Sequence, residues 1–281
     1  MSLLTLVELV ALGAVWGGSF LFLRIAAADI GVAPLVELRL ILGALVLLPF
    51  LWQERARIPD MPWLRLTGIG VLNSAAPFLL IAWATEHAPA GIAALTNATV
   101  VMFAALFAWA LYGERIGAHR ALGLAAGFIG VAILASGRVG GESLWAAVLA
   151  GLLGSLLYGL SVNLIRHHLR GLPASATAAA TLLGPAVLTA PLAIAQWPRH
   201  HVAPVSWVSA VLLGVVCTGA AYVIYYRLIH RIGAPRAATV TYLIPLFGVL
   251  WGWMVLGEPL TPTMAVSGAL ILGGVALSQR A

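Results

Sequence analysis

The sequence contains no lysine, a single cysteine and few charged residues of either sign. Because a retinal protein needs a lysine for its Schiff base, the missing lysine excludes that class. The single cysteine, Cys217, precludes a disulfide bond within the chain. Charged residues make up 9% of the 281 residues, far less than the surface of a water-soluble domain requires. The composition therefore excludes a soluble protein.

Apolar residues are abundant instead, at 62% of the chain, and the mean hydropathy is +1.03. Apolar runs of about 20 residues, the length that crosses a bilayer core of about 30 Å, follow one another along the chain. We therefore predict an all-α membrane protein surrounded by membrane lipids. Its ten predicted transmembrane helices span residues 3–27, 34–52, 63–85, 90–112, 118–137, 144–165, 174–196, 204–229, 234–256 and 262–279.

The sequence repeats itself at a fixed spacing. Gly257-Glu258 lies 144 residues after Gly113-Glu114, and the same shift superimposes Gly274–Ala276 on Gly130–Ala132. A constant internal shift indicates two copies of one structural unit. The predicted domains are a first five-helix repeat and a second five-helix repeat, residues 1–137 and 144–281. Because five is odd, the second repeat enters the membrane from the opposite side, which predicts inverted repeats. Inverted repeats are typical of alternating-access transporters with a site between the halves.

Arginine positions predict the orientation, since basic residues gather on the cytoplasmic side of membrane proteins. The net charge of +6 comes from arginines scattered over loops, so it does not indicate a nucleic-acid partner. With the N-terminus inside, eleven arginines lie on the cytoplasmic side, namely Arg55, Arg57, Arg65, Arg115, Arg120, Arg166, Arg170, Arg227, Arg231, Arg236 and Arg280. Three lie outside, namely Arg24, Arg138 and Arg199. Both termini are therefore predicted to be cytoplasmic.

An aromatic residue next to glycine occurs at matching points of the first and sixth predicted helices. Trp16-Gly17 and Tyr158-Gly159 are 142 residues apart. Glycine lets two helix backbones approach, while the adjacent ring projects into the remaining space. We predict that Trp16 and Tyr158 line a central cavity. Ordinary helix packing is the alternative for the glycines.

Hydroxyl and aromatic side chains also recur together in the third and eighth predicted helices. Ser74 and Phe78 are four residues apart, as are Thr218 and Tyr222, so each pair shares a helix face. Two such faces would form the walls of an amphipathic pocket. Pro77 frees the carbonyl group of Asn73 from its helical hydrogen bond, which offers a ligand acceptor or a hinge. The alternative is that the hydroxyls bond their own backbone and the proline only bends the helix.

Three further polar residues complete the predicted binding site. Asn97 and Asn163 lie within spans, where an amide is costly unless it is hydrogen-bonded. They are candidates for substrate contact or for hydrogen bonds between helices. Tyr242 lies one turn before Pro245 in the ninth predicted helix, and its ring is predicted to face the same site.

The fifth and tenth predicted helices carry small residues at packing spacings and almost no polar atoms. Gly123, Gly127 and Gly130 lie in the fifth, and Gly268 and Gly274 lie in the tenth. Small residues allow close helix packing in membranes, so these helices are predicted to form an outer scaffold or a homodimer contact.

Charged residues within the spans are few and lie near helix ends. We expect the side chains of Glu8, Glu37 and Arg39 to reach the membrane interface. Glu37 and Arg39 are two residues apart, hence on opposite faces, and are not expected to pair. Because no carboxylate lies in the middle third of a span, we predict facilitated diffusion without obligatory proton exchange. The alternative is that helix tilt draws Glu8 inward and makes it a proton carrier.

The histidine pairs do not indicate a metal site. The predicted topology places His167-His168 and His200-His201 on opposite sides of the bilayer, and no carboxylate or cysteine lies near either pair in the sequence. Zinc requires three or four convergent ligands. The sequence also contains neither G-x-S-x-G nor H-E-x-x-H. We therefore expect no metal, no cofactor and no catalytic residues.

The chain resembles the drug/metabolite transporter superfamily, in its ten-helix branch built from two EamA-type repeats. The resemblance is carried by Trp16-Gly17, Arg39, Gly113-Glu114, Gly257-Glu258 and the glycine-rich fifth and tenth helices. Val101 departs from the family pattern, because a proline usually stands where Pro245 stands in the second repeat, so equal bending of the two halves is not expected. The resemblance implies a transporter in the bacterial inner membrane that exports small metabolites, often amino acids, through a central cavity.

The aromatic residues of the predicted cavity are similar to those of the YddG-type aromatic amino-acid exporters. We therefore expect export of amino acids with aromatic or large apolar side chains. Efflux of drugs, nucleosides or sugars is the alternative within the same class. A membrane-embedded enzyme and a receptor or structural subunit are alternatives from other classes. Turnover without a gradient would reveal the enzyme, and ligand binding without movement across liposomes would reveal the receptor.

Overall fold

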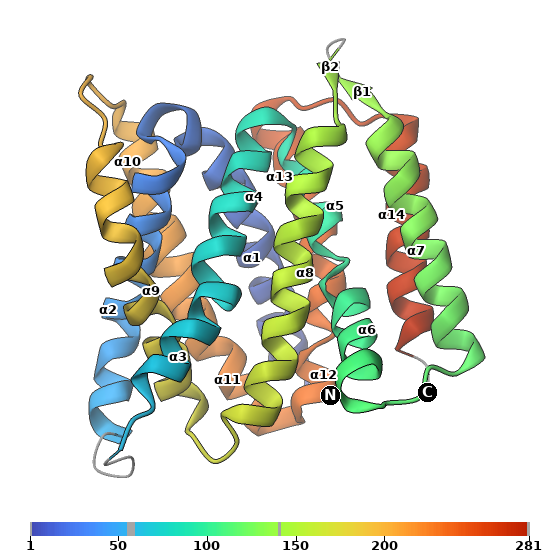
Figure 1. Cartoon of the computed structure of the whole chain (residues 1–281). Coiled ribbons are helices and arrows are strands. Elements are labelled where there is room, and N and C mark those ends of the chain that lie inside the picture. The colour runs from blue at the N-terminus through green and yellow to red at the C-terminus, as the bar shows by residue number, and fades with distance from the viewer. Residues whose placement is uncertain (1, 55–59, 140–141, 280–281) are drawn as a thin grey trace.

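A computed structural model describes residues 2–54, 60–139 and 142–279 of the chain. Arg55, Arg57 and Arg280, three of the eleven arginines assigned to the cytoplasmic side, lie outside the described residues. The described part forms a bundle of helices that run up and down between two ends (Figure 1).

The first half forms five membrane-length segments. The third and fourth are each built from consecutive pieces, and the third contains the π-helical stretch η2. The elements are α1 (Leu3–Ile30), α2 (Val32–Glu54), α3 (Trp63–Gly70), η2 (Val71–Ala75), α4 (Ala76–His87), α5 (Ala90–Asn97), α6 (Val100–Tyr112) and α7 (Ala118–Ser136). A two-stranded hairpin of β1 (Arg138–Val139) and β2 (Glu142–Ser143) follows, in which Arg138 pairs with Ser143.

The second half repeats this arrangement. The third and fourth segments of this half, which are the eighth and ninth of the chain, are again built from pieces. The eighth contains the π-helical stretch η3. The elements are α8 (Trp145–His168), α9 (Ala174–Ala195), α10 (Pro204–Val211), η3 (Leu212–Ala220), α11 (Ala221–Ile232), α12 (Ala234–Ala237), α13 (Val240–Leu256) and α14 (Pro262–Ser278). Every predicted span coincides with one of these segments to within three residues.

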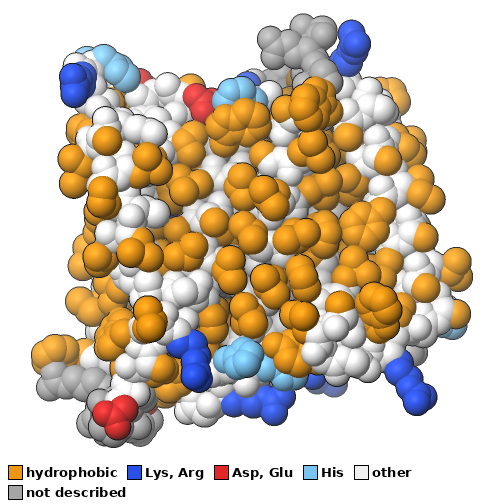
Figure 2. Space-filling view, viewed as in Figure 1, with side chains coloured by type: hydrophobic (Ala, Val, Ile, Leu, Met, Phe, Trp, Pro, Cys, Tyr) orange, Lys and Arg blue, Asp and Glu red, His pale blue; other side chains and the backbone are white. Residues whose placement is uncertain are grey.

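The membrane assignment is confirmed by the helices themselves. Eight helical segments of the described chain are long and apolar enough to cross a membrane, and α13 and α14 add two shorter apolar helices. Figure 2 shows apolar side chains covering the middle of the bundle, with arginines and histidines gathered at its two ends. A lipid-facing belt between charged ends is the expected surface of a membrane-spanning bundle.

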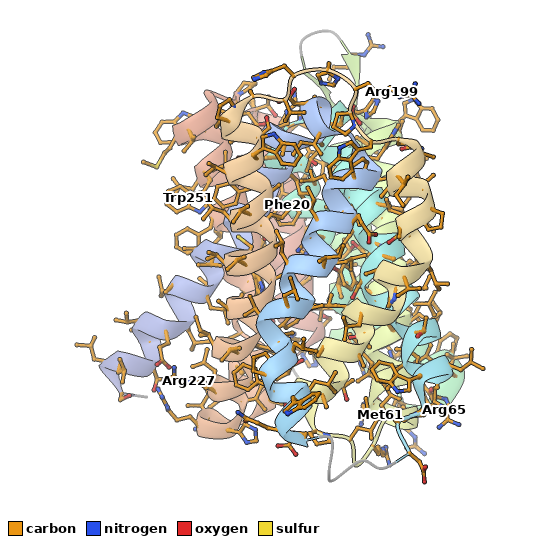
Figure 3. All side chains as sticks on the ribbon, turned by 90° about the vertical axis from the view of Figure 1, so that its left-hand side faces the viewer. Phe20, Met61, Arg65, Arg199, Arg227 and Trp251 are labelled. Atoms are coloured by element: carbon orange, nitrogen blue, oxygen red, sulfur yellow. The ribbon has the colours of Figure 1, made fainter. Side chains whose placement is uncertain are left out.

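The two halves run in opposite directions. Both chain ends lie at one end of the bundle, here called the terminal face, and the β1–β2 hairpin lies at the other, the hairpin face (Figure 1). The first half therefore runs from the terminal face to the hairpin face, and the second half runs back. Figure 3 shows Arg199 at the hairpin face and Arg65 and Arg227 at the terminal face. The predicted ten transmembrane helices in two inverted five-helix repeats are thus confirmed as ten membrane-length segments of the described chain.

Glycines at matching positions of the repeats join the two halves. A Cβ atom on Gly17 of α1 would lie 2.5 Å from Cβ of Phe247 in α13. A Cβ atom on Gly159 of α8 would lie 2.7 Å from Cβ of Phe103 in α6. The predicted close approach of helix backbones beside Trp16 and Tyr158 is therefore present twice, once in each repeat.

Gly17→Val is expected to lower the stability of the purified protein by about 1–3 kcal/mol, the usual cost of overpacking. Gly68→Val is the matched control, because a Cβ atom on Gly68 in α3 meets nothing within 4 Å. Thermal unfolding in detergent measures both. Equal midpoints for the two variants would show that the α1–α13 contact tolerates a side chain.

The glycine-rich helices α7 and α14 lie side by side at the edge of the bundle (Figure 1). A Cβ atom on Gly123 would lie 2.5 Å from the carbonyl oxygen of Gly274, and one on Gly274 would lie 2.5 Å from that of Gly123. The small residues thus pack against each other within one chain. A homodimer through these helices stays a prediction, and it would use their outward faces.

The breaks in the fourth and ninth segments differ between the repeats. α5 ends at Asn97 and α6 begins at Val100, whereas α12 ends at Ala237, which matches Ala93 of the first repeat. Pro245 lies inside α13, and no proline stands at the matching position, Val101. The two halves are therefore interrupted at different places, and unequal bending at Pro245 and Val101 stays a prediction.

Candidate substrate cavity

A cavity of about 270 Å³ lies between the two halves of the bundle. The first half contributes six chemically distinctive side chains to its wall, namely Trp16, Ser19, Phe20, Arg39, Phe78 and Asn97. The second half contributes six more, namely Tyr158, Cys217, Thr218, Tyr222, Tyr225 and Thr241. Six of the ten predicted site residues line this cavity: Trp16, Phe78, Asn97, Tyr158, Thr218 and Tyr222.

Six aromatic side chains, contributed by both halves, line the cavity. The Trp16 ring centroid lies 6.3 Å from that of Tyr222 and 5.1 Å from that of Tyr225, both edge-on. Across the cavity Phe78 and Tyr158 meet edge-on at 6.4 Å. Edge-to-face contacts at such separations hold rings in fixed orientations. The wall therefore presents rigid apolar faces to a bound solute.

Four predicted site residues lie elsewhere. Asn73 accepts a hydrogen bond of 2.9 Å at Oδ1 from the Ser161 hydroxyl, which ties η2 to α8. Ser74 is fully buried outside the cavity, and its hydroxyl has no partner among the described residues. Asn163 donates from Nδ2 to the carbonyl oxygens of Ala104 and Gly159, both at 2.9 Å. The bond to Ala104 joins α8 to α6, the contact between helices that was the alternative to substrate contact, and the bond to Gly159 lies within α8.

Tyr242 is the fourth residue outside the cavity. Its hydroxyl donates a 2.6 Å hydrogen bond to Oε1 of Gln279, near the end of α14. The ring packs against a cluster that contains Met102, Leu124 and Val275. Tyr242 therefore joins α13 to the edge helices. A role in binding the solute stays a prediction for these four residues.

Arg39 is the residue that sequence reasoning misplaced. Its side chain was expected to reach the membrane interface, and this is wrong: Arg39 is 8% exposed and lines the cavity. Nε donates a 3.0 Å hydrogen bond to the Thr218 hydroxyl, and the guanidinium carbon lies 3.6 Å above the centroid of the Phe78 ring. The reason lies one turn along α2, where Gly43 lets η3 approach so closely that Thr218 comes within reach of Arg39.

Glu37 was also expected at the interface, and this too is wrong. It is 6% exposed, and its carboxylate accepts a hydrogen bond from the Thr189 hydroxyl of α9. Glu37 and Arg39 thus lie on different faces of α2 and have different partners, as their spacing predicts. The sequence signal that could have revealed Arg39 was Gly43, four residues further along the same face.

A second void of about 680 Å³ adjoins the first and lies toward the terminal face. The two voids share Val101 and Val162 in their walls. The lining of the second void includes Arg115, Arg120 and Arg166 together with Glu114. The second void therefore lies between the central cavity and the terminal face.

The hairpin face is closed by contacts around Arg24 and Glu258. Arg24 donates from Nη1 to the carbonyl oxygens of Thr85 and Glu86, at 2.8 and 2.6 Å. The Glu258 carboxylate accepts a 2.9 Å hydrogen bond from the backbone N–H of Ala90, at the first residue of α5. Arg24 and Glu258 themselves lie 3.8 Å apart. These contacts join α1, the α4–α5 connection and the end of α13.

The repeat mates of this pair meet at the terminal face. Arg166 lies 142 residues after Arg24, and Glu114 lies 144 residues before Glu258. The Arg166 guanidinium donates a 2.7 Å hydrogen bond to the Glu114 carboxylate. Each repeat therefore supplies the arginine at one face and the glutamate at the other. The terminal pair is more exposed, with Glu114 at 32% against 12% for Glu258.

Both glutamates follow a glycine that ends a helix in the left-handed conformation, with φ of 69° at Gly113 and 66° at Gly257. A glycine in this conformation is a common way to end a helix.

The histidines do not converge. His167 stacks on Tyr112 at 3.5 Å, whereas the His200 ring makes a 3.0 Å hydrogen bond with the carbonyl oxygen of Asp29 at the end of α1. Within the described ranges no three His, Cys, Asp or Glu side chains gather as a metal site would require.

The sequence profile of the EamA-like transporter family matches the chain twice, over residues 4–136 and 145–279. The chain belongs to this family. It is therefore a membrane transporter built from two EamA repeats, within the drug/metabolite transporter superfamily. A solved structure with 22% sequence identity has the same fold, with a TM-score of 0.65 over 96% of this chain and 95% of the other.

Relatives of this EamA-family chain include proteins named as an exporter and as a transporter. A protein of Streptantibioticus cattleyicolor named a probable terminal-alkyne amino-acid exporter is 27% identical, over 94% of this chain and 90% of its own length. An uncharacterised protein of Pseudomonas aeruginosa is 30% identical over 98% and 93%. The uncharacterised inner membrane transporter YedA of Escherichia coli K12 is 26% identical over 90% and 83%.

Proposed function

We propose that this EamA-family protein exports amino acids with aromatic or large apolar side chains, through the cavity between its inverted repeats. The observation that carries the proposal is the cavity wall, in which rings from both halves surround a few polar groups. Small-molecule sites combine apolar walls with a few polar groups and usually enclose about 300–1,000 Å³. A cavity of about 270 Å³ suits a solute of amino-acid size better than a bulky drug.

The test is an efflux screen with purified protein in liposomes loaded with single amino acids. We expect phenylalanine, tryptophan or leucine to leave faster than glycine or glutamate. Export of none of the amino acids, together with export of nucleosides or sugars, would replace this proposal by the alternative substrate classes. The relative named as an amino-acid exporter supports testing amino acids first.

Alternating access is the proposed mechanism. The structure joins the repeats through Glu258 at the hairpin face and through Arg166–Glu114 at the terminal face, where a large void lies beside the contact. In the opposite state, the hairpin face would open and the terminal void would close. The pairs Arg24–Glu258 and Arg166–Glu114 support this proposal, because they are repeat mates that lie at opposite faces. Each pair could join the repeats when its own face is closed.

The proposed orientation places both termini in the cytoplasm of a bacterium, with the protein in its inner membrane. The described arginines divide between the faces as the sequence predicts: Arg24, Arg138 and Arg199 lie toward the hairpin face, which is then external. In this orientation the cavity faces the cytoplasm and is ready to load a solute for export.

Labelling of single cysteines tests the orientation. In a Cys217→Ser background, His201→Cys is expected to react with a membrane-impermeant maleimide on intact cells, because His201 is exposed at the hairpin face. His119→Cys, at the start of α7 on the terminal face, is the matched control and should react only after the membrane is disrupted. The reverse pattern would place the termini outside.

Facilitated diffusion is the proposed energetics. Among the described residues, the central cavity is lined by no carboxylate. Glu8, the candidate proton carrier, pairs instead with Arg231 at 2.7 Å and with Arg227 at 3.5 Å, both in α11 near the terminal face. A carboxylate fixed between two arginines outside the cavity is poorly placed to exchange a proton for each solute.

A further inference from the structure

We propose that Arg39 binds the carboxylate group of the transported solute, and that the protein therefore selects monocarboxylates over amines and neutral amides. The proposal rests on the central cavity being the transport site. It names the chemical group that the solute must carry and the residue that recognises it.

The charge of Arg39 has no anionic partner in the described part of the protein. Its ionisable neighbours are Tyr158, Tyr222 and Cys217, and none of these is a carboxylic acid. A buried charge is costly unless it is paired, and the Thr218 hydroxyl and the Phe78 ring offset only part of that cost. An anionic ligand in the cavity would supply the missing charge.

Four glutamates of the bundle are engaged elsewhere. Glu37 lies on another face of α2 and binds Thr189. Glu8 pairs with arginines of α11, Glu114 with Arg166, and Glu258 with the N–H of Ala90. None of these four is free to turn toward Arg39 without losing an existing partner.

The orientation of Arg39 suits a carboxylate. Nε is held by Thr218, whose hydroxyl in turn donates a 2.9 Å hydrogen bond to the carbonyl oxygen of Leu213. The guanidinium plane rests against the Phe78 ring. Both contacts fix the group and leave its terminal N–H donors available. A guanidinium fork matches the two oxygens of a carboxylate in a bidentate contact. Thr218 is therefore a positioning residue for Arg39.

Ser19 supplies a second, independent observation. Its side chain lines the same cavity and is 5% exposed, and its buried hydroxyl has no oxygen or nitrogen hydrogen-bond partner among the described residues. The Cys217 thiol beside it is only a weak hydrogen-bonding group. A buried hydroxyl is normally hydrogen-bonded, so an unpartnered one in a cavity wall points to a polar group of a ligand. A carboxylate oxygen would satisfy it.

The aromatic wall then receives the rest of the solute. The rings of Trp16, Tyr222 and Tyr225 offer apolar faces to a side chain, and such faces also attract an ammonium group. An amino acid and its deaminated acid share the carboxylate that Arg39 would bind. A lipophilic cation without a carboxylate would be repelled by Arg39.

Binding of matched probes to the purified protein in lipid nanodiscs tests the proposal. The probes are phenylalanine, phenylalaninamide, 3-phenylpropionate and 3-phenylpropionamide, measured by calorimetry. We expect each acid to bind about tenfold or more tightly than its amide, the usual scale for a charge-assisted hydrogen bond. Arg39→Met should bring the ratio of the amide's Kd to the acid's Kd close to one, and Thr218→Val should lower this ratio. Arg65→Met, which removes an exposed arginine outside the cavity, should leave it unchanged.

The preference of the wild-type protein for acid over amide tests the proposal even if the Arg39 variant does not fold. Equal binding of acid and amide, or no binding of either acid at millimolar concentration, overturns the proposal. If 3-phenylpropionate is preferred over its amide but phenylalanine is neither bound nor transported, Arg39 is the carboxylate site and amino-acid export fails. If phenylalanine is transported but its amide binds equally well, amino-acid export stands and the role of Arg39 fails.

Discussion

Trp16→Ala and Tyr222→Ala are each expected to slow amino-acid transport about ten- to hundredfold while leaving the amount of protein in the membrane unchanged. The two rings meet edge-on at 6.3 Å across the joint between α1 and α11 and form one wall of the cavity. Losing an aromatic contact with a bound solute costs about 1–3 kcal/mol, which corresponds to about this factor in binding. Efflux from loaded liposomes measures the effect.

Trp109→Ala is the matched control for this experiment. Trp109 lies in α6 and is 54% exposed on the outside of the bundle, so its removal takes an equal volume from the protein without touching the cavity. We expect its transport to be close to that of the wild type. Normal transport by both cavity variants would place the solute elsewhere in the bundle.

Glu258→Ala is expected to raise the rate at which Cys217 reacts with an impermeant thiol reagent added from the hairpin face. Cys217 lines the cavity and is the only cysteine of the chain, so it reports on access without further substitutions. The Glu258 carboxylate closes this face by accepting the N–H of Ala90. A hydrogen bond to a charged group contributes about 1.5–3 kcal/mol, so its loss should raise the open population about ten- to hundredfold.

Glu114→Ala is the control, because Glu114 is the repeat mate of Glu258. Its partner Arg166 is 59% exposed, and ion pairs between exposed groups contribute only about 0.2–1 kcal/mol. Access to Cys217 from the hairpin face should therefore change by about fivefold or less. Equal effects of the two substitutions would show that Glu258 does not hold the hairpin face closed.

Much of this fold could be predicted from the sequence, because a bilayer imposes simple requirements. A helix must be about 20 residues long to cross it, so the spans emerge from apolar runs with ends marked by glycine, proline and arginine. The inverted arrangement could be predicted from two features alone, the fixed shift between Glu114 and Glu258 and the odd number of helices in each repeat. The π-helical stretches η2 and η3 could not be foreseen, since one extra residue in a turn leaves no clear compositional signal.

The candidate site was predictable where the repeat supplied two copies of a signal. Trp16 and Tyr158 are repeat mates, and both line the cavity. Single residues were harder to place. Asn163 and Tyr242 looked suited to a ligand, but each finds a partner on a neighbouring helix. Arg39 looked like an interfacial arginine, and only the approach of η3 beside Gly43 reveals that it faces inward.

Counterflow in liposomes tests the central claim, that the chain is a carrier whose cavity opens alternately to the two sides. Liposomes with the purified protein are loaded with unlabelled phenylalanine and diluted into labelled phenylalanine, at equal pH and without a membrane potential. Transient accumulation of the label, lost in Tyr222→Ala, is the predicted result. Uptake that occurs only under an imposed proton gradient, and that Glu8→Gln abolishes, would contradict the account and make Glu8 the coupling residue.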